Sequence, residues 1–328
     1  MSLGAAGAGL AAAAWSIRRA RRRRSLASRP PAPPRPPASV PAAAARHQVA
    51  TSDGGSIHVV EHGEGPAVVL LHGVTLTSDI WANQFEDLAG AHRVIALDQR
   101  GHGRSDAGSG GYALGRMADD LFEVLEELEV EQAVVVGHSM GGMVALTAAT
   151  GRPDLFATRV AGLVLLSTSG GPYPTGGRPV PAPLASGAVA VVGRQLSRND
   201  GRGVGILPVP RLATLAARLA FGQAPAAADV ALTRRVMGPM SPTSLAGCIG
   251  AIASHDVSGR LAGITVPTRV VVGTRDLLTP PFHARRLAQG IPGAELVTLP
   301  GCGHMPMLER RDELAAVVTG LAAAAAAR

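Results

Sequence analysis

Short runs of apolar residues recur along the chain from about residue 47 onward, and each is bounded by glycine, proline or charged residues. A short apolar run between turn residues is typical of a strand that is buried on both faces of a sheet. On this basis we predict strands at residues 56–61, 67–71, 93–97, 133–136, 162–166, 268–272 and 295–299.

Helical patterns separate these runs. The clearest covers residues 118–128, where leucine and valine side chains fall on one helix face and acidic side chains occupy the other. Residues 143–150 and 311–326 also read as helices. Because strands and helices alternate, we predict an α/β fold with a mostly parallel, doubly wound sheet that is covered on both faces.

The alternation stops within residues 172–261, where proline and glycine are frequent and helical patches at 212–221 and 226–237 replace strands. An insertion here would lie above the strand ends, so we predict a helical cap over a core made of residues 47–171 and 262–328. Some apolar side chains of this insertion are candidates for lining a pocket, although an apolar stripe is more often ordinary packing. These candidates are Ile206, Leu212, Leu215, Leu219, Phe221, Val236 and Met240.

Residues 137–142 read Gly-His-Ser-Met-Gly-Gly and connect the apolar run at 133–136 to the predicted helix at 143–150. This G-x-S-x-G pattern is typical of a nucleophile elbow, a tight turn between a strand and a helix that exposes a serine hydroxyl. Glycine is needed there because the strained backbone leaves little room for side chains. Ser139 is therefore the candidate nucleophile.

A serine hydroxyl becomes a nucleophile at neutral pH only when a base takes its proton and a carboxylate orients that base. His304, in a glycine-rich loop after the predicted strand at 295–299, is the candidate base. Asp276, which follows the predicted strand at 268–272, is the candidate acid. The chain order Ser, Asp, His differs from the orders of the chymotrypsin and subtilisin types.

Other histidines and acids of the motifs are less suited to these roles. His72, His102 and His138 each precede a glycine or the nucleophile in a tight turn, and we interpret them as loop-bracing groups. Asp98 opens a glycine-rich loop and Asp256 lies in a polar stretch before a strand, so neither is preferred as the acid.

An oxyanion hole needs two backbone N–H donors aimed at the charge that develops on the substrate oxygen. Met140, the residue after the nucleophile, is expected to supply one. The predicted strand at 67–71 ends in His-Gly, and the N–H of Val74 in the following loop is expected to supply the other.

Five stretches of the chain, in this order, are similar to α/β-hydrolase fold proteins of the bacterial esterase, lipase and cofactor-free perhydrolase type. They are residues 71–81, 97–106, 137–142, 273–276 and 303–306. The resemblance implies the α/β-hydrolase fold and acyl-transfer chemistry. Similar dehalogenases and epoxide hydrolases carry aspartate at the nucleophile position, so Ser139 argues against both.

The expected function is that of a serine hydrolase that cleaves a carboxylic ester, with a small to medium apolar acyl group, through an acyl-enzyme. Two alternatives remain open. One is a different reaction on the same residues, by a cofactor-free perhydrolase or haloperoxidase or by a carbon–carbon hydrolase. The other is a non-catalytic protein that binds a small ligand. The expected partner is a small ester or acyl compound, and the sequence does not give the oligomeric state.

The formal charge of +7 does not indicate a nucleic-acid partner, because nine arginines and no acid precede residue 47, which leaves −2 for the rest of the chain. Residues 1–46 combine an Ala/Gly-rich run, an arginine cluster and a proline-rich segment. Arginines placed after the apolar run argue against a cleaved export signal. Two interpretations remain, a tail that attaches a cytoplasmic enzyme to the inner face of the membrane and a disordered leader.

Cys248 and Cys302 are the only cysteines. Two cysteines are too few for a disulfide framework, and we interpret Cys302 as a small packing residue rather than a nucleophile. The sequence shows no metal-ligand cluster and no phosphate-binding glycine loop. We therefore expect neither a metal nor a cofactor.

Overall fold

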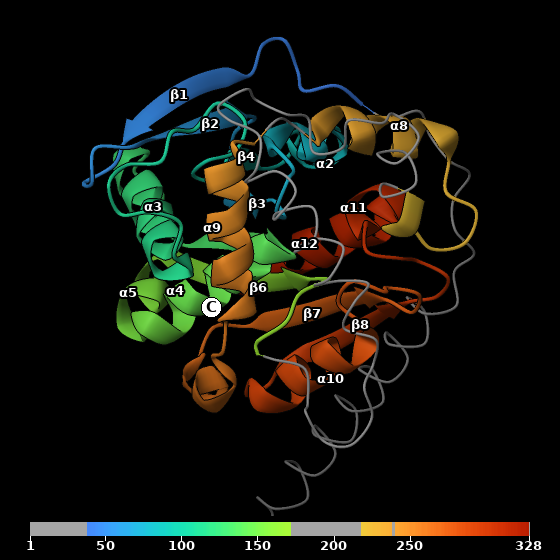
Figure 1. The fold of residues 1–328 in the computed structure, drawn as a ribbon. Coiled ribbons are helices and arrows are strands. Elements are labelled where there is room, and N and C mark those ends of the chain that lie inside the picture. The colour runs from blue at the N-terminus through green and yellow to red at the C-terminus, as the bar shows by residue number, and fades with distance from the viewer. Residues whose placement is uncertain (1–37, 172–217, 238–239, 328) are drawn as a thin grey trace, which may run out of the picture.

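The computed structural model describes residues 38–171, 218–237 and 240–327. Within these residues an eight-stranded sheet forms the centre of the molecule (Figure 1). Its strands are β1 (Ala45–Ala50), β2 (Ser56–His62), β3 (Ala67–Leu71), β4 (Arg93–Leu97), β5 (Ala133–His138), β6 (Val160–Leu166), β7 (Thr268–Gly273) and β8 (Glu295–Leu299).

The strands lie in the order β1-β2-β4-β3-β5-β6-β7-β8. β1 pairs with β2 and β2 pairs with β4 in antiparallel fashion, and all the other pairs are parallel. The prediction of a mostly parallel sheet is therefore confirmed. In such a sheet the carboxyl ends of the parallel strands meet at one edge, which is where the loops after β3, β5, β7 and β8 gather.

The described helices follow the strands along the chain. They are α2 (Ala82–Leu88), α3 (Leu114–Glu127), α4 (Met140–Gly151), α5 (Pro153–Arg159), α8 (Ala227–Val236), α9 (Pro242–Ala253), α10 (Pro281–Gly290), α11 (Pro306–Glu309) and α12 (Arg311–Ala326), with 3-10 turns η1 (Ser78–Trp81) and η3 (Ser258–Gly263).

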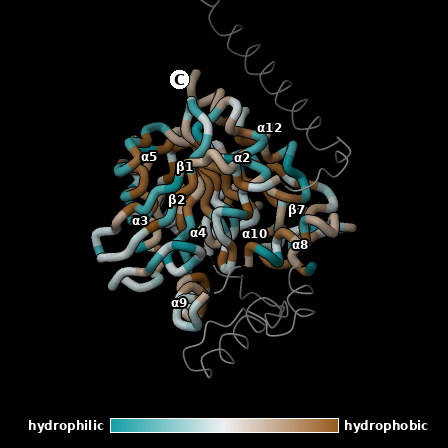
Figure 2. The backbone as a smooth tube through the Cα atoms, turned by 90° about the horizontal axis from the view of Figure 1, so that it is seen from above, coloured by the Kyte–Doolittle hydropathy of each residue, from teal (hydrophilic) through white to brown (hydrophobic). Residues whose placement is uncertain are grey.

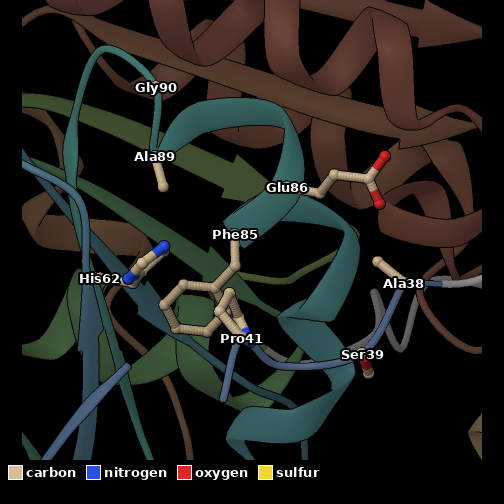
Figure 3. Close-up of a pocket in the computed structure, with 8 residues that line it drawn as sticks. All are labelled: Ala38, Ser39, Pro41, His62, Phe85, Glu86, Ala89 and Gly90. Atoms are coloured by element: carbon tan, nitrogen blue, oxygen red, sulfur yellow. The ribbon is translucent and has the colours of Figure 1, made fainter. Parts of the chain in front are cut away.

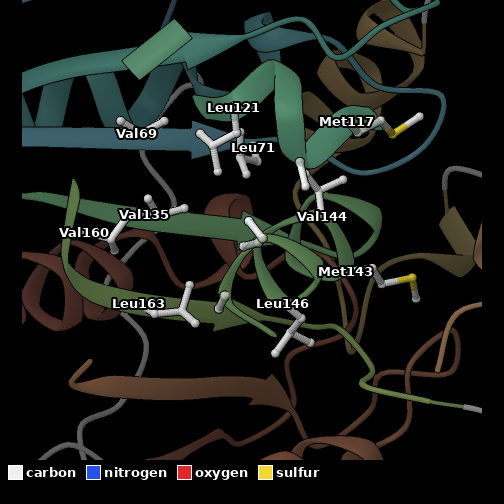
Figure 4. Packing of buried hydrophobic residues seen from close by; sticks show 14 of the residues in the cluster. Val69, Leu71, Met117, Leu121, Val135, Met143, Val144, Leu146, Val160 and Leu163 are labelled. Carbon is white, nitrogen blue, oxygen red and sulfur yellow. The ribbon is translucent and has the colours of Figure 1, made fainter. Parts of the chain in front are cut away.

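Side chains that alternate along the strands divide the core into two clusters, one on each face of the sheet. On β3, Val69 and Leu71 belong to the cluster that packs against α3, α4 and α10. Val68 and Leu70 belong to the cluster that packs against α2 and α12. Figure 4 shows the first cluster, and Figure 2 shows the hydrophobic strands enclosed by more hydrophilic outer segments. Helices on both faces make the sheet doubly wound.

All seven predicted strands are present, and the sequence analysis misses only β1 among the described strands. β1 lies at the edge of the sheet, and of its six side chains only that of Val49 is buried. An edge strand of this kind leaves no apolar run in the sequence. β1 begins at Ala45, two residues before the point at which the sequence analysis places the start of the core.

The predicted helices at 118–128, 143–150, 226–237 and 311–326 correspond to α3, α4, α8 and α12. α4 starts at Met140, so the glycines after the serine belong to its first turn. The helix predicted at 212–221 lies mostly outside the described residues. Of the predicted cap, the structure describes α8, α9 and their flanking residues.

Of the helices that the structure describes, none combines the length and the apolar character that are needed to cross a membrane. The Ala/Gly-rich run and the arginine cluster of the predicted leader lie within residues 1–37, outside the described part of the chain.

Candidate active site

Ser139 occupies the single-residue turn between β5 and α4, with φ 51° and ψ −116°. A non-glycine residue in this region of backbone space is strained, and such strain gathers at functional sites. The turn is closed by glycine: a Cβ atom on Gly137 would lie 2.6 Å from the Gly141 carbonyl oxygen, and one on Gly141 would lie 2.3 Å from that of Leu71. The sequence therefore folds into the tight elbow that its glycines predict, and Ser139 stays partly exposed.

The neighbouring strand β6 holds the elbow in place. The Ser139 N–H donates to the carbonyl oxygen of Leu166 at 3.0 Å, and the Thr168 hydroxyl donates to the Ser139 carbonyl oxygen at 2.6 Å. The N–H and the carbonyl oxygen of Ser139 are thus both hydrogen-bonded, the first to the last residue of β6 and the second to the loop that follows it. The strained conformation is fixed by its surroundings rather than by the turn alone.

Asp276 and His304 lie in the loops after β7 and β8 and contact each other. His304 Nδ1 lies 3.0 Å from Oδ1 and 3.0 Å from Oδ2 of Asp276. Both side chains are buried, with 5% of His304 and 2% of Asp276 exposed. β7 and β8 are adjacent and parallel, so the loops that follow them lie side by side. These loops bring together two residues that are 28 positions apart in the sequence.

Thr279 completes the surroundings of the carboxylate. Asp276 Oδ1 accepts hydrogen bonds from the N–H groups of Leu278 and Thr279, both at 2.9 Å, and Oδ2 accepts one from the Thr279 hydroxyl at 2.8 Å. Burial alone would raise the pKa of Asp276, but His304 and the bonds from Thr279 hold it below its ordinary value of 3.8.

An ionised carboxylate accepts and cannot donate, so Nδ1 of His304 carries the proton that it shares with Asp276. Nε2 of the neutral imidazole is then the basic nitrogen. This is the tautomer that a general base requires, and the geometry of Asp276 selects it.

The loop after β3 passes directly beside the serine. A Cβ atom on Gly73 would lie 3.1 Å from the Ser139 Cβ atom, a tighter contact than most side chains make, so glycine favours this approach. Val74 follows in the same loop, and Met140 is the first residue of α4, whose N–H has no partner within the helix. Within the described residues neither N–H donates a hydrogen bond. Both amides lie next to the elbow, and their oxyanion role stays a prediction.

The three other histidines of the motifs brace loops. The imidazole of His72 bonds the Gly73 carbonyl oxygen at 2.8 Å through Nδ1 and accepts from the Gln99 N–H at 2.9 Å through Nε2. His102 Nδ1 bonds the Arg100 carbonyl oxygen at 3.1 Å. His138 Nε2 lies 2.8 Å from the His304 carbonyl oxygen. Burial lowers the pKa of His102 and of His138 to about 3, so both are neutral.

The two rival acids are engaged elsewhere. Asp98 accepts from the N–H of Ser78 at 2.6 Å and from that of Arg104 at 2.9 Å, which ties two loops together. Asp256 accepts the N–H and hydroxyl of Ser258 at the start of η3. Thr279 and Glu309, which the sequence analysis did not single out, hold Asp276 and the His304 loop respectively. The threonine three residues after the aspartate was a usable signal, because short polar side chains commonly bond across such turns.

Among residues 38–171, 218–237 and 240–327, no group of three or more His, Cys, Asp or Glu side chains is arranged to hold a metal ion. Cys248 and Cys302 are both buried free thiols. Burial raises the pKa of Cys248 to about 12 and that of Cys302 well above 9.0. Neither thiol is activated as a nucleophile.

A shallow pocket lies away from these residues. It is bordered by Pro41 before β1, by His62 at the end of β2 and by Phe85 of α2 (Figure 3). His62 pairs with Val94 near the start of β4, so the pocket opens at the amino-terminal edge of the parallel strands. Ser139, Asp276 and His304 lie at the opposite edge, and the pocket takes no part in their chemistry.

Comparison with known proteins agrees with this architecture. The model of the family described as alpha/beta hydrolase fold matches residues 66–311. The chain is 33% identical over 262 residues to RutD of Variovorax paradoxus, a proposed carbamate hydrolase. The match covers 76% of this chain and 89% of that protein.

Solved structures with a similar fold include an esterase and a lactonase. A thermophilic esterase from Thermogutta terrifontis is 26% identical with a TM-score of 0.70, and the match covers 86% of this chain and 99% of that one. The enol-lactonase from Burkholderia xenovorans is 27% identical with a TM-score of 0.66, over 81% and 96% of the two chains.

The family match covers well over half of the sequence, and the chain therefore belongs to the alpha/beta hydrolase fold family. The predicted superfamily, the predicted fold class and the expectation of an enzyme are confirmed.

Proposed function

We propose that this enzyme is a serine hydrolase that cleaves carboxylic esters through an acyl-enzyme, with Ser139 as nucleophile, His304 as base and Asp276 as the acid that orients the base. The observation that carries the proposal is the double contact of the Asp276 carboxylate with Nδ1 of His304, since it leaves Nε2 as the free base. The strained and partly exposed Ser139 at the same edge of the sheet supports it.

The reaction then follows two steps. Nε2 of His304 takes the proton of the Ser139 hydroxyl as Oγ attacks the ester carbonyl, and the ionised Asp276 stabilises the imidazolium that forms. The N–H groups of Val74 and Met140 donate to the oxyanion, and His304 returns the proton to the leaving alcohol. Water, activated by the same base, releases the acid and restores the serine.

We propose a small to medium apolar acyl group and a cap formed by residues 172–261. Support for the cap comes from the described part of this insertion, which packs on the core through the buried side chains of Phe221, Val236 and Met240. These three side chains therefore serve packing in the described structure, whereas Leu219 is exposed. Ile206, Leu212 and Leu215 lie outside the described residues.

Carbamate hydrolysis is a second candidate, because a relative that is 33% identical is named for it. A carbamate presents a carbonyl carbon to the same nucleophile and base, so no additional residue is needed. The perhydrolase, carbon–carbon hydrolase and ligand-binding alternatives would use the same edge of the sheet, and only measured turnover separates them.

The first experiment is labelling with a fluorophosphonate probe, together with turnover of p-nitrophenyl acetate, butyrate and octanoate. We expect the wild-type protein to be labelled on Ser139, as located by mass spectrometry of the digest. In Ser139→Ala we expect labelling to vanish and ester turnover to fall by at least about 10⁴-fold.

Ser167→Ala is the matched control, because Ser167 follows the neighbouring strand β6 and also has a positive φ of 46°. It should retain labelling and most of the turnover. A Ser139→Ala protein that kept full turnover would refute the mechanism. A folded wild-type protein that is neither labelled nor active on esters, carbamates or peroxide with halide would favour ligand binding instead.

A further inference from the structure

The main chain around His304 is held from three directions. Nε2 of His138, in the elbow, lies 2.8 Å from the His304 carbonyl oxygen. The His304 N–H donates to the carbonyl oxygen of Ala220 at 2.6 Å. The Glu309 carboxylate accepts the N–H groups on either side, from Gly303 at 2.9 Å and from Met305 at 3.4 Å. This stretch of backbone carries the imidazole that contacts Asp276.

Glu309 joins two of these supports. Its Oε1 faces Gly303 and Met305, and its Oε2 accepts the N–H of Gly222 at 2.8 Å. Gly222 belongs to the same short segment as Ala220, which bonds the His304 N–H. One carboxylate therefore connects the loop that carries His304 with residues 220–222 of the insertion.

The two backbones meet without space for side chains. A Cβ atom on Gly222 would lie 2.0 Å from the Gly301 carbonyl oxygen, and one on Gly303 would lie 2.4 Å from the Gly222 nitrogen. The Gln223 N–H also donates to the Gly301 carbonyl oxygen at 3.0 Å. A shift of residues 220–222 would thus be transmitted directly to the loop before His304.

The chemistry around Glu309 requires an ionised carboxylate. The groups that point at its oxygens are N–H donors, with the Cys302 thiol at 3.6 Å as a weak further donor. A glutamine would turn its own NH₂ group against one of these N–H groups and leave a donor without an acceptor. Within the described residues no cation forms an ion pair with Glu309. The hydrogen bonds from backbone N–H groups are therefore what stabilises the negative charge of its carboxylate.

The charged group that interacts with Glu309 is Asp229 of α8, while the adjacent Arg310 and Arg311 act on Cys302 and on Asp229 respectively. Burial, only partly offset by the backbone hydrogen bonds, raises the pKa of Glu309 above its ordinary value of 4.5. The buried Asp229 carboxyl has no hydrogen bond of its own within the described part of the chain, and its pKa is raised to about 6 by burial and by Glu309.

From these contacts we infer that Glu309 is a positioning residue for the catalytic base: it fixes the main chain of His304 against residues 220–222 and so sets the imidazole between Ser139 and Asp276. The inference rests on the proposed function, in which His304 is the base. Glu309 touches neither substrate nor the reacting atoms, and it acts through the N–H groups of Gly303 and Met305.

The test is Glu309→Gln in the full-length protein, with Glu123→Gln as the matched control. Glu123 of α3 is another partly buried carboxylate, but it bonds Ser52 in the turn after β1 and Arg116 of α3, away from His304. For Glu309→Gln we expect kcat for p-nitrophenyl acetate to fall by about 10- to 100-fold with KM changed by less than about 3-fold, because the base is displaced while the rest of the site is unchanged. The control should keep wild-type kcat.

A second readout does not depend on turnover. The Nδ1 proton that His304 shares with Asp276 should give a far-downfield proton resonance, and its loss in His304→Asn would assign it. In Glu309→Gln this resonance should broaden or shift, and in Glu123→Gln it should not. If the wild-type protein hydrolyses no ester, the proposed function fails, and this resonance still decides whether Glu309 places His304.

Wild-type kcat and an unchanged resonance in a folded Glu309→Gln protein would overturn the inference. If that variant does not fold, Glu309→Asp keeps the charge but is too short to span both partners, and we expect the same fall in kcat with a native thermal transition. Loss of the fold in both variants would make Glu309 a folding residue and would equally overturn the inference.

Discussion

The carboxylate of Asp276 decides which nitrogen of His304 is basic, and an amide at this position would reverse the choice. In Asp276→Asn the amide oxygen can still accept the N–H groups of Leu278 and Thr279. The NH₂ group would then replace Oδ2 and donate to Nδ1 of His304. The imidazole would carry its proton on Nε2 and could no longer accept one from Ser139.

For Asp276→Asn we therefore expect a native fold and a fall in kcat for p-nitrophenyl butyrate of about 10³- to 10⁴-fold. Circular dichroism and steady-state kinetics measure both quantities. Asp256→Asn is the control, because within the described residues the Asp256 carboxylate accepts hydrogen bonds from Ser258 alone. Activity of Asp276→Asn within about 10-fold of wild type would show that another group orients the base.

At the scale of single residues, the sequence indicates the candidate reacting groups better than the residues that support them. Ser139 and His304 stand in glycine-rich motifs whose spacing is set by chemistry, so they can be recognised without coordinates. Glu309 reads as an ordinary charged residue at the start of a helical pattern. Its role depends on Gly222, which lies 87 positions away, and nothing local in the sequence predicts that contact.

At the scale of elements, the two glycines Gly141 and Gly151 of α4 differ in the space around them. A Cβ atom on Gly141 would lie 2.3 Å from the Leu71 carbonyl oxygen and 2.7 Å from that of His72, both on rigid backbone. A Cβ atom on Gly151, at the other end of the same helix, would meet nothing within 4 Å. The first glycine is required by packing against the end of β3, and the second is not.

We expect Gly141→Ala to lower the free energy of unfolding by about 1 to 3 kcal/mol, because the backbone must shift to relieve the overlap. The ester turnover that we propose should fall as well, since the loop after β3 lies against the elbow. Gly151→Ala should change stability by less than about 1 kcal/mol, in the stabilising direction. Urea unfolding of both variants tests the contrast, and equal stabilities would contradict it.

The same contrast between local and distant signals explains which elements the sequence predicts. The strands β3 and β5 are buried on both faces, so their apolar runs are visible without knowledge of their neighbours. β1 exists because its main chain pairs with β2 along the sheet edge, while its side chains are mostly exposed. Main-chain pairing leaves no mark on composition, and β1 is missed for that reason.

At the scale of the whole molecule, the number of buried neutral histidines couples folding to pH. Burial lowers the pKa of six histidines below the ordinary value of 6.5, namely His58, His72, His102, His138, His255 and His283. A group whose pKa is lower in the folded state binds more protons when the chain is unfolded. The stability that these histidines contribute is therefore complete above pH 6.5 and is lost as the pH falls below it.

Two carboxyls, one buried and one partly buried, act in the opposite direction. The pKa of Asp229 is raised to about 6 and that of Glu309 is also raised, in each case mainly by burial. The folded protein takes up their protons first on acidification, so these groups regain stability as the pH falls below about 6. Six histidines outweigh two carboxyls, and the net expectation is a loss of stability between pH 6.5 and pH 5.

We expect the free energy of unfolding, measured by urea titration, to fall by several kcal/mol from pH 7.5 to pH 5, since each histidine with a pKa near 3 contributes a loss of about 2 kcal/mol at pH 5. His102→Asn should make this fall smaller by about that amount. Asp229→Asn should make it larger, because it removes a group that opposes the loss. The two variants thus change the fall in the free energy of unfolding between pH 7.5 and pH 5 in opposite directions. If both variants change it in the same direction, or neither changes it, the acid sensitivity arises from other groups.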